Sequence, residues 1–344
     1  MARLVAAVGL LLAALALEAA PAPPPTLGLP TVVDPPENPT TAAKIALGRK
    51  LFFDKRLSAD NSISCATCHD PHYGFADPHP VSVGVKGLQG ERNSPTILNS
   101  VFAEVFMWDG RSPTLEDQVS LPFASPAEFG LPQEQAAQKL RQQGYSGLFQ
   151  QAFHEDVTPS NISRAIAAYQ RTLVAADAPF DRYVFKHDQS ALSADARRGF
   201  QVFLDAKCDA CHLVMTEGLH PFALKYAVFT DGKFHNLGVD AAKSNPDPGR
   251  YTVTGAREDW GRFRTPSLRN VALTAPYFHD GSKATLAEVV EFYDQGGGPN
   301  PNLDPALLPL HLSVQQKQDL VKFLESLTSP HIAALGGDPD GAED

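Results

Sequence analysis

Two short stretches, Cys65-Ala66-Thr67-Cys68-His69 and Cys208-Asp209-Ala210-Cys211-His212, share one pattern and hold all four cysteines of the 344-residue chain. In C-x-x-C-H, the attachment sequence of c-type haem, both thiols form thioethers and the histidine becomes the proximal iron ligand. A zinc site normally draws four ligands, with a C-x-x-C pair at each end, and a redox dithiol does not need the histidine. The pattern therefore predicts two covalently bound haem c groups, one on each motif.

An internal repeat precedes the two motifs. Gly48-Arg49-Lys50-Leu51-Phe52 and Gly199-Phe200-Gln201-Val202-Phe203 both read Gly-x-x-aliphatic-Phe, which suggests two related domains. Helix starts are predicted at Thr158-Pro159, at a capping box of Thr285 and Glu288, and at another of Ser313 and Gln316. Sustained strand alternation bounded by hairpin signals is absent from the sequence, so we expect an all-α fold with long loops.

Charge and the N-terminus restrict the partners and the compartment. A net charge of −10 argues against a nucleic-acid partner but leaves basic proteins open. Residues 1–22 are predicted to be a secretory signal peptide, because the apolar run is shorter than the roughly 20 residues of a membrane span. Retention as an N-terminal anchor is the alternative. After cleavage we expect no membrane span and a periplasmic protein, with a proline-rich, extended lead-in at 23–40.

Few methionines are available as axial ligands. Beyond Met1 the chain has only Met107 and Met215. Met215 lies too close to His212 to reach the opposite face of a haem, and Met107 belongs to the other half. The second haem therefore needs another sixth ligand or stays open, which weakens the interpretation as a simple electron-transfer protein.

Three stretches make the sequence resemble the bacterial di-haem cytochrome c peroxidase family, including its MauG-like branch. They are Arg92-Asn93-Ser94-Pro95-Thr96, Phe106-Met107-Trp108-Asp109-Gly110-Arg111, and the segment from Arg264-Thr265-Pro266-Ser267-Leu268-Arg269 to His279-Asp280-Gly281-Ser282. The resemblance covers about residues 40–328. It implies two cytochrome c-like haem domains: a peroxidatic domain at 41–180 and an electron-transfer domain at 181–330, followed by a flexible tail at 331–344.

The resemblance also assigns roles to individual residues. Trp108 matches the tryptophan that relays electrons between the haems; without the resemblance it would be a packing residue. Gln118 and Glu128 match a distal pair in which Glu128 moves a proton during cleavage of the peroxide bond, although such residues are more often solvated. Pro122 matches a proline on the same open face. Asn93, Thr274 and Pro276 match the ligands of an inter-haem calcium.

Two positions depart from the ordinary peroxidase pattern. Val85 stands where peroxidases that need reductive activation carry a histidine ligand, so the first haem is expected to be five-coordinate and open to peroxide. His72 and His79 are the nearby alternatives. Tyr293 stands where those peroxidases have methionine and where the MauG branch has tyrosine; we expect it to bind the second iron, lowering its reduction potential. The competing interpretation is a buried core tyrosine.

The resemblance implies an oxidoreductase that reacts with hydrogen peroxide. The departures at Val85 and Tyr293 favour MauG-like oxidation of a protein substrate. One alternative is a peroxidase that takes electrons from a small cytochrome c or cupredoxin, and the other is a di-haem electron carrier without enzymatic activity.

Overall fold

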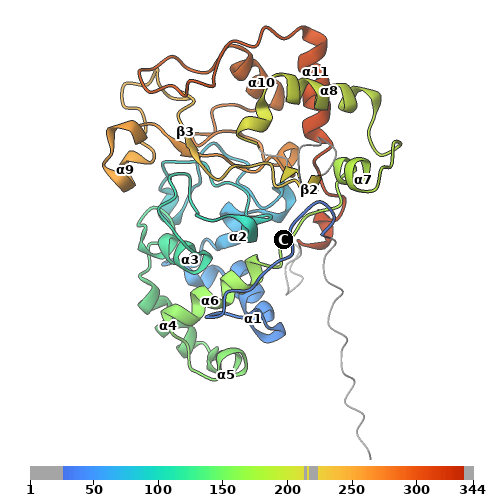
Figure 1. Ribbon diagram of the computed structural model, residues 1–344. Helices are drawn as coiled ribbons and strands as arrows, with labels where there is room; N and C mark the ends of the chain where they lie inside the picture. The colour runs from blue at the N-terminus through green and yellow to red at the C-terminus, as the bar shows by residue number, and fades with distance from the viewer. Residues whose placement is uncertain (1–25, 213–214, 217–223, 337–344) are drawn as a thin grey trace, which may run out of the picture.

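The computed structural model describes residues 26–212, 215–216 and 224–336, and it is mostly helical (Figure 1). The α-helices of the first half are α1 (Ala42–Phe53), α2 (Cys65–Cys68), α3 (Leu115–Ala124), α4 (Gln133–Gln142), α5 (Ser146–Phe153) and α6 (Pro159–Gln170). Those of the second half are α7 (Pro179–Phe185), α8 (Ala194–Asp205), α9 (Tyr251–Thr254), α10 (Leu286–Asp294) and α11 (Val314–Glu325). Two short antiparallel pairs join β1 (Met215–Thr216) to β2 (Leu224–Tyr226) and β3 (Phe234–His235) to β4 (Phe263–Arg264).

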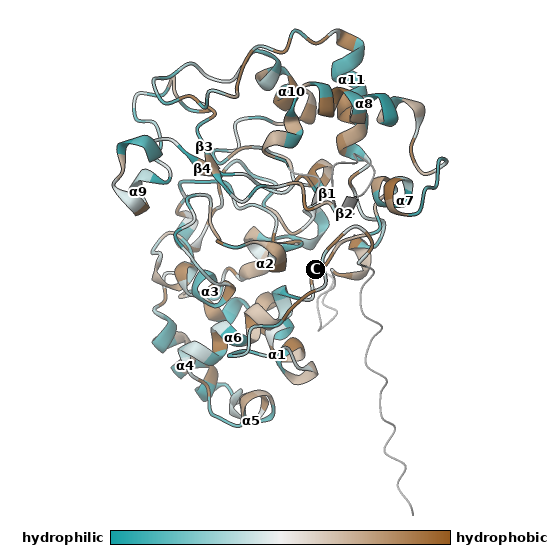
Figure 2. Cartoon of the chain, viewed as in Figure 1, coloured by the Kyte–Doolittle hydropathy of each residue, from teal (hydrophilic) through white to brown (hydrophobic). Residues whose placement is uncertain are grey.

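The chain forms two lobes with separate hydrophobic cores. The core of the first lobe is built around α1 and α6 and includes Phe52, Ile162 and Ile166. The core of the second lobe is built around α8 and α11, where Phe203 and Phe323 are fully or almost fully buried. Figure 2 shows apolar residues on α8, α10 and α11 at the upper end of the molecule, where these helices lie together.

The repeated glycines explain how the main helix pair of each lobe packs. A Cβ atom on Gly48 of α1 would lie 1.9 Å from the carbonyl oxygen of Ala165 in α6. A Cβ atom on Gly199 of α8 would lie 1.9 Å from the carbonyl oxygen of Asp319 in α11. Because only glycine permits this approach, the repeat predicted from the sequence corresponds to the same close helix crossing in both lobes.

The predicted helix starts are confirmed. Thr158 caps α6 by accepting from the backbone N–H of Asn161, and Pro159 is the first helical residue. Reciprocal capping boxes form at the starts of α10 and α11, at the residues predicted. These local hydrogen bonds satisfy backbone donors that a helix start leaves unpaired.

The terminal segments contact both lobes. The lead-in contains no helix before α1 but is interrupted by turns at 27–29 and 36–38, and the carbonyl of Gly28 accepts from Arg269 of the second lobe at 2.8 Å. Residues 331–336 differ from the expected flexible tail: Ile332 is buried in the first core, and His331 pairs with Asp177 at 3.2 Å. The predicted signal peptide lies outside the described residues, as does the end of the tail.

The two lobes also repeat one turn. In each lobe a left-handed asparagine, Asn99 or Asn270, precedes a short 3-10 turn. A bridge then pairs Phe106 with Ser112 in the first lobe and Tyr277 with Lys283 in the second. Each turn ends at a threonine that caps the next helix, Thr114 for α3 and Thr285 for α10. Trp108 and His279 therefore occupy matching positions.

The lobes join by exchanging hydrogen bonds between these repeated segments. The backbone N–H of Asn93 donates to the carbonyl of His279 at 2.7 Å, and that of Arg264 donates to the carbonyl of Trp108 at 2.8 Å. Each lobe thus supplies one donor and one acceptor, which fixes the two turns against each other around Trp108.

Candidate haem sites

The two histidines of the C-x-x-C-H motifs have the same surroundings. His69 Nδ1 lies 3.2 Å from the carbonyl oxygen of Phe75, and His212 Nδ1 lies 3.0 Å from that of Phe229. Donation of Nδ1–H to a carbonyl leaves Nε2 with a lone pair for a metal. Burial lowers the pKa of both imidazoles, although the carbonyl contacts oppose the shift. Both histidines are therefore held as neutral ligands, as a proximal haem ligand must be.

Three of the neighbouring thiols do not have the properties of a redox cysteine. Burial raises the pKa of Cys65 to about 12, that of Cys68 to about 11 and that of Cys208 to about 12. A redox dithiol needs the thiolate, and its surroundings lower this pKa instead. The half-buried cysteine pairs fit thioether anchors, so the residues present fit two haem c groups.

One potential metal cluster borders the second motif. Cys211, Asp231 and His235 bring three ligand atoms within 4.8 Å of one another. Cys211 belongs to the haem-attachment motif, however, and His235 is already held by Asp231 at 3.0 Å and by Asp304 at 2.6 Å. The three side chains of this cluster thus already have other roles or partners.

A cavity of about 990 Å³ lies against the first motif and is lined by Cys68 and His69. Its volume is at the upper end of the roughly 300–1,000 Å³ typical of ligand and cofactor sites. The residues predicted for the distal face, Gln118, Pro122 and Glu128, line the same cavity, and so does Trp108, the predicted electron relay. Residues far apart in the sequence thus meet at one site.

Helix α3 and the turn after it position the distal residues. Gln118 and Pro122 lie four residues apart and so share one face of the helix. Glu128 follows in a turn in which its N–H donates to the carbonyl of Ser125 at 3.2 Å. Burial raises the pKa of the Glu128 carboxyl group, and a hydrogen bond from the Ser125 side chain opposes that rise. A carboxyl group with a raised pKa is suited to proton transfer near neutral pH.

Val85 lies outside this cavity. Its side chain is buried in the first core, and its N–H donates to the carbonyl of Glu128 at 3.1 Å, which anchors the distal turn. The two nearby histidines point to solvent: His72 is 89% exposed and paired with Asp70, and His79 is 70% exposed and paired with Asp77. Neither is among the described residues that line the cavity.

Tyr293 and Pro122 occupy matching positions. Each stands eight residues after the threonine that caps its helix, Pro122 in α3 and Tyr293 in α10. Burial raises the pKa of the Tyr293 phenol, and the nearby thiols of Cys208 and Cys211 add to the rise. The phenol therefore lies beside the second motif, where a protein can use it as an iron ligand. Pro122 offers no ligand atom at the corresponding place. This equivalence was not identified from the sequence, although the equal spacing from each capping threonine could have revealed it.

The contacts of Asn93 connect the predicted calcium ligands to Trp108. Asn93 is buried, its Nδ2 donates to the carbonyl of His79 at 3.0 Å, and its own carbonyl accepts from Trp108 Nε1 at 2.8 Å. Thr274 and Pro276 lie in the turn before Tyr277, and the peptide bond before Pro276 is cis. Calcium binding by Asn93, Thr274 and Pro276 stays a prediction.

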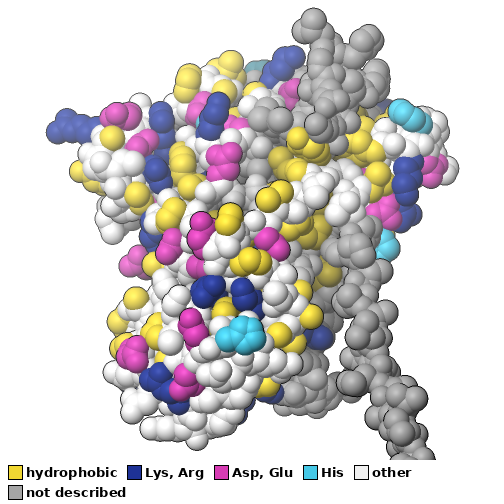
Figure 3. All heavy atoms as spheres, turned by 60° about the horizontal axis from the view of Figure 1, so that its bottom comes forward, with side chains coloured by type: hydrophobic (Ala, Val, Ile, Leu, Met, Phe, Trp, Pro, Cys, Tyr) yellow, Lys and Arg dark blue, Asp and Glu magenta, His cyan; other side chains and the backbone are white. Residues whose placement is uncertain are grey.

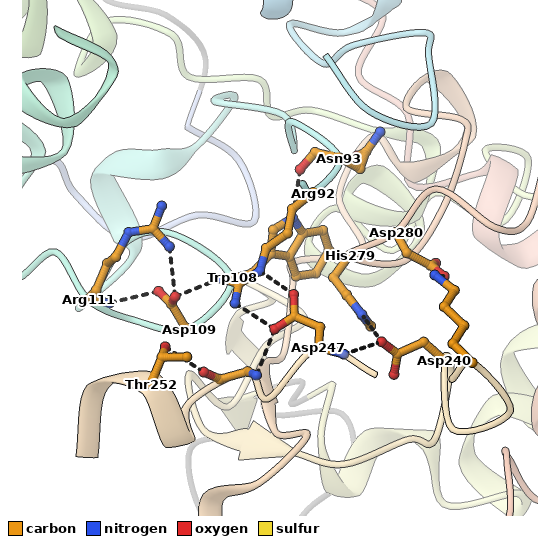
Figure 4. A network of polar contacts seen from close by, with 12 residues as sticks. Arg92, Asn93, Trp108, Asp109, Arg111, Asp240, Asp247, Thr252, His279 and Asp280 are labelled. Atoms are coloured by element: carbon orange, nitrogen blue, oxygen red, sulfur yellow. Dashed lines mark hydrogen bonds and ion pairs between the residues drawn. The ribbon is translucent and has the colours of Figure 1, made fainter. Parts of the chain in front are cut away.

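A polar network surrounds Trp108 at the junction of the lobes (Figure 4). Arg92 contacts Asp109 of its own lobe at 2.6 Å and binds Asp247 of the other lobe through two nitrogens, at 2.6 and 2.8 Å. The ring of His279 stands edge-on to Trp108, with centroids 6.5 Å apart, and stacks on Phe263 at 3.6 Å. This packing holds Trp108 in place at the junction of the lobes.

Comparison with known proteins identifies the relatives of this chain. The profile of the di-haem cytochrome c peroxidase family matches residues 42–190, and that of cytochrome c matches residues 196–328. The methylamine utilization protein MauG of Methylorubrum extorquens is 38% identical over 86% of this chain and 81% of its own length. Cytochrome-c peroxidase IdrP1 of a Pseudomonas species is 39% identical over 90% of this chain and 87% of its own.

Solved structures give the same fold. A MauG-like protein associated with microbial copper homeostasis superposes with a TM-score of 0.78 at 33% identity, covering 90% of this chain and 98% of its own. The di-haem peroxidase BthA of Burkholderia thailandensis shares the fold, with a TM-score of 0.76 at 23% identity, over 91% of this chain and 92% of its own. None of the helices in the described part of the chain is both long and apolar enough to cross a membrane.

Proposed function

This chain belongs to the di-haem cytochrome c peroxidase family and is an oxidoreductase of the peroxidase or MauG type, and we propose that it oxidises a protein substrate with hydrogen peroxide. The family implies two haem c groups and hydrogen peroxide as the oxidant. We further propose that the protein works in the periplasm, where c-type haem is attached. We also propose that a calcium ion binds between the two haem sites.

The observation that carries this proposal is the cavity beside His69. Glu128 and Gln118 line it, and Pro122 has no donor atom at the place that matches Tyr293. Val85 is buried in the core, and His72 and His79 face solvent, so none of these three residues supplies a further iron ligand at this cavity. This arrangement supports reaction with peroxide in the fully oxidised protein.

The side chains around the cavity have separable tasks. Haem held by Cys65, Cys68 and His69 would supply an iron that gives electrons to peroxide and regains them from the substrate. Glu128 takes the proton from one peroxide oxygen and delivers it to the other, so that the departing oxygen leaves as water. Gln118 offers an amide on the same wall to orient the peroxide. Complete reduction of one peroxide consumes two electrons and two protons and yields two waters, and Trp108 passes those electrons between the lobes in this proposal.

Tyr293 favours a protein substrate over an ordinary electron donor. A phenolate is a hard anionic ligand that stabilises oxidised iron, whereas methionine raises the reduction potential. A site of low potential accepts electrons poorly from a small cytochrome c or cupredoxin. Such a donor remains the alternative, because MauG and peroxidase relatives have similar identities to this chain. Membership of an enzyme family argues against a simple electron carrier.

The surface provides no strongly charged docking site on the face that Figure 3 displays. Acidic and basic side chains are interspersed there, with scattered hydrophobic groups between them. Because the charges on this face are mixed, long-range electrostatic attraction would contribute little to the association of a protein partner with it.

Two measurements on the oxidised holoprotein test the proposal. Stoichiometric hydrogen peroxide should change the Soret band within the mixing time, and an unchanged spectrum would refute the peroxide reaction. Steady-state oxidation of a reduced small cytochrome c or cupredoxin should then be slow. Rapid turnover with either donor would support peroxide detoxification over protein oxidation.

A further inference from the structure

One arginine in the wall of the first cavity has no carboxylate partner. Arg92, Arg111, Arg264 and Arg269 all line this cavity. Arg92 and Arg111 pair with Asp109 at 2.6 and 2.7 Å, and Arg269 pairs with Asp181 at 2.8 Å. Among the described residues, the guanidinium of Arg264 is paired with no acid.

The contacts of Arg264 with the protein are weak. Its Nε lies 3.5 Å from the carbonyl oxygen of Met107, and its Nη1 lies 3.4 Å from that of Thr265. Both distances are at the outer limit of a hydrogen bond, where the interaction contributes little. Burial lowers the pKa of this guanidinium, and no neighbouring charge opposes the shift. A largely buried cation without an anion is costly, so the site is incomplete as the protein alone builds it.

The backbone of Arg264 is held rigidly despite these weak side-chain contacts. Its N–H donates to the carbonyl of Trp108, and strand β4 pairs Arg264 with Phe234 of β3. The guanidinium is therefore presented to the cavity from the second lobe, beside Trp108, which lines the same cavity. Such positioning suits an arginine that binds an anion held at a fixed place, and it does not suit an arginine that extends into solvent.

We propose that Arg264 binds a propionate carboxylate of the haem attached at Cys65, Cys68 and His69. A haem c carries two propionates, and a guanidinium matches a carboxylate through two parallel hydrogen bonds. The second lobe thereby contributes a cofactor-binding residue to the first haem site. This inference depends only on haem at the first motif, so it can fail while the proposed peroxide reaction stands.

The proposed contact makes the potential of the first haem depend on Arg264. A positive charge beside the cofactor favours the reduced iron, which carries one positive charge fewer. Loss of that charge should lower the reduction potential. It should also raise the pKa of the released propionate, so that the potential varies with pH where that of the parent protein does not.

The test uses full-length holoprotein and spectroelectrochemistry, which follows the two haems separately by their spectra. Arg264→Gln should shift the potential of the first haem downward and make it dependent on pH. Arg264→Lys keeps the charge but loses the paired hydrogen bonds, so an intermediate shift is expected. Arg262→Gln is the matched control, because Arg262 is 37% exposed and its pairing with Asp259, at 3.7 Å, is loose.

The outcomes separate the possible sources of the anion. A shift confined to the second haem would overturn the assignment to the first and point to a propionate of the other cofactor. Unchanged potentials in both Arg264 variants would overturn the proposal altogether. If Arg264→Gln does not assemble with both haems, Arg264→Met, which also removes the charge, takes its place, and a potential equal to that of the parent protein would overturn the contact.

Discussion

At the scale of single residues, Glu128 has a role that its surroundings create. Its carboxyl group sits on a turn anchored by Ser125 and Val85, and burial raises its pKa above the usual 4.5. The carboxylate form needed to accept a proton is therefore lost as the pH falls through this raised pKa. We expect the rate of the Soret change with peroxide to fall in the same range.

Glu128→Gln should remove this pH dependence and slow the reaction by about 10²–10⁴-fold, the usual contribution of a general acid or base. Stopped-flow mixing of the oxidised variant with peroxide measures both effects. Glu134→Gln is the control, since Glu134 is 72% exposed and bound only loosely, by Arg141 at 3.4 Å. A variant at Glu128 that reacts at the parent rate would exclude this residue as the proton carrier.

Tyr293 makes a second prediction at this scale. Tyr293→Phe removes only the hydroxyl group and keeps the ring, which packs against Phe278 and Phe292 with centroids 6.3 and 5.8 Å away. We expect the absorption and paramagnetic resonance spectra of the second haem alone to change, and its reduction potential to rise. Tyr277→Phe is the control, because that hydroxyl donates to the carbonyl of Val271 at 3.1 Å. Identical spectra for Tyr293→Phe and the parent protein would rule out ligation.

At the scale of elements, the sequence predicted what depends on local chemistry. The capped starts of α6, α10 and α11 could be recognised because a cap and its partner lie within three residues. The contacts of Arg92 with Asp247 and of Asn93 with His279 could not, because they join segments far apart in the chain. The match of Pro122 with Tyr293 was visible only after both turns had been placed.

The glycines at the helix crossings give a prediction for these elements. Gly48→Ala and Gly199→Ala would force the added methyl group onto a backbone carbonyl, so each should destabilise its own lobe by about 1–3 kcal/mol, as overpacking does. Gly147→Ala in α5 meets no atom within 4 Å and should stabilise the first lobe by about 0.5–1 kcal/mol. Denaturant unfolding measures the change in stability of each variant. Hydrogen exchange in α1 and α8 shows which lobe is affected. Unaltered protection of α1 in Gly48→Ala would contradict the close crossing.

At the scale of the whole molecule, function requires two lobes to hold their haem sites in a fixed relation. Symmetric backbone hydrogen bonds between Asn93 and His279 and between Arg264 and Trp108 set this relation. The lead-in and the segment around Ile332 cross from one lobe to the other and strengthen it. The lobes therefore resemble two copies of one haem-binding unit whose equivalent turns became each other's binding partners.

Arg92 is the strongest polar link in this junction, and it provides the last prediction. Burial alone would raise the pKa values of Asp109 and Asp247, but hydrogen bonds and charge from Arg92 hold both below the usual 3.8. Carboxyl groups with lowered pKa values stabilise the fold above pH 3.8, and this contribution is lost as the pH falls through the folded-state values. Arg92→Gln leaves Asp247 without its cationic partner and should cost about 3–5 kcal/mol at neutral pH.

Denaturant unfolding of Arg92→Gln at several pH values measures this cost. Without Arg92, the pKa values of the two carboxyl groups are no longer lowered by its charge and hydrogen bonds. The variant should therefore lose less stability than the parent protein when the pH is lowered from 6 to 3. Arg262→Gln serves again as an exposed control. Hydrogen exchange at the amides of Asn93 and Arg264 locates the effect, because loosening of the lobes must expose both donors. A variant that loses stability equally at all pH values, with both amides still protected, would show that Arg92 supports one lobe and not the junction.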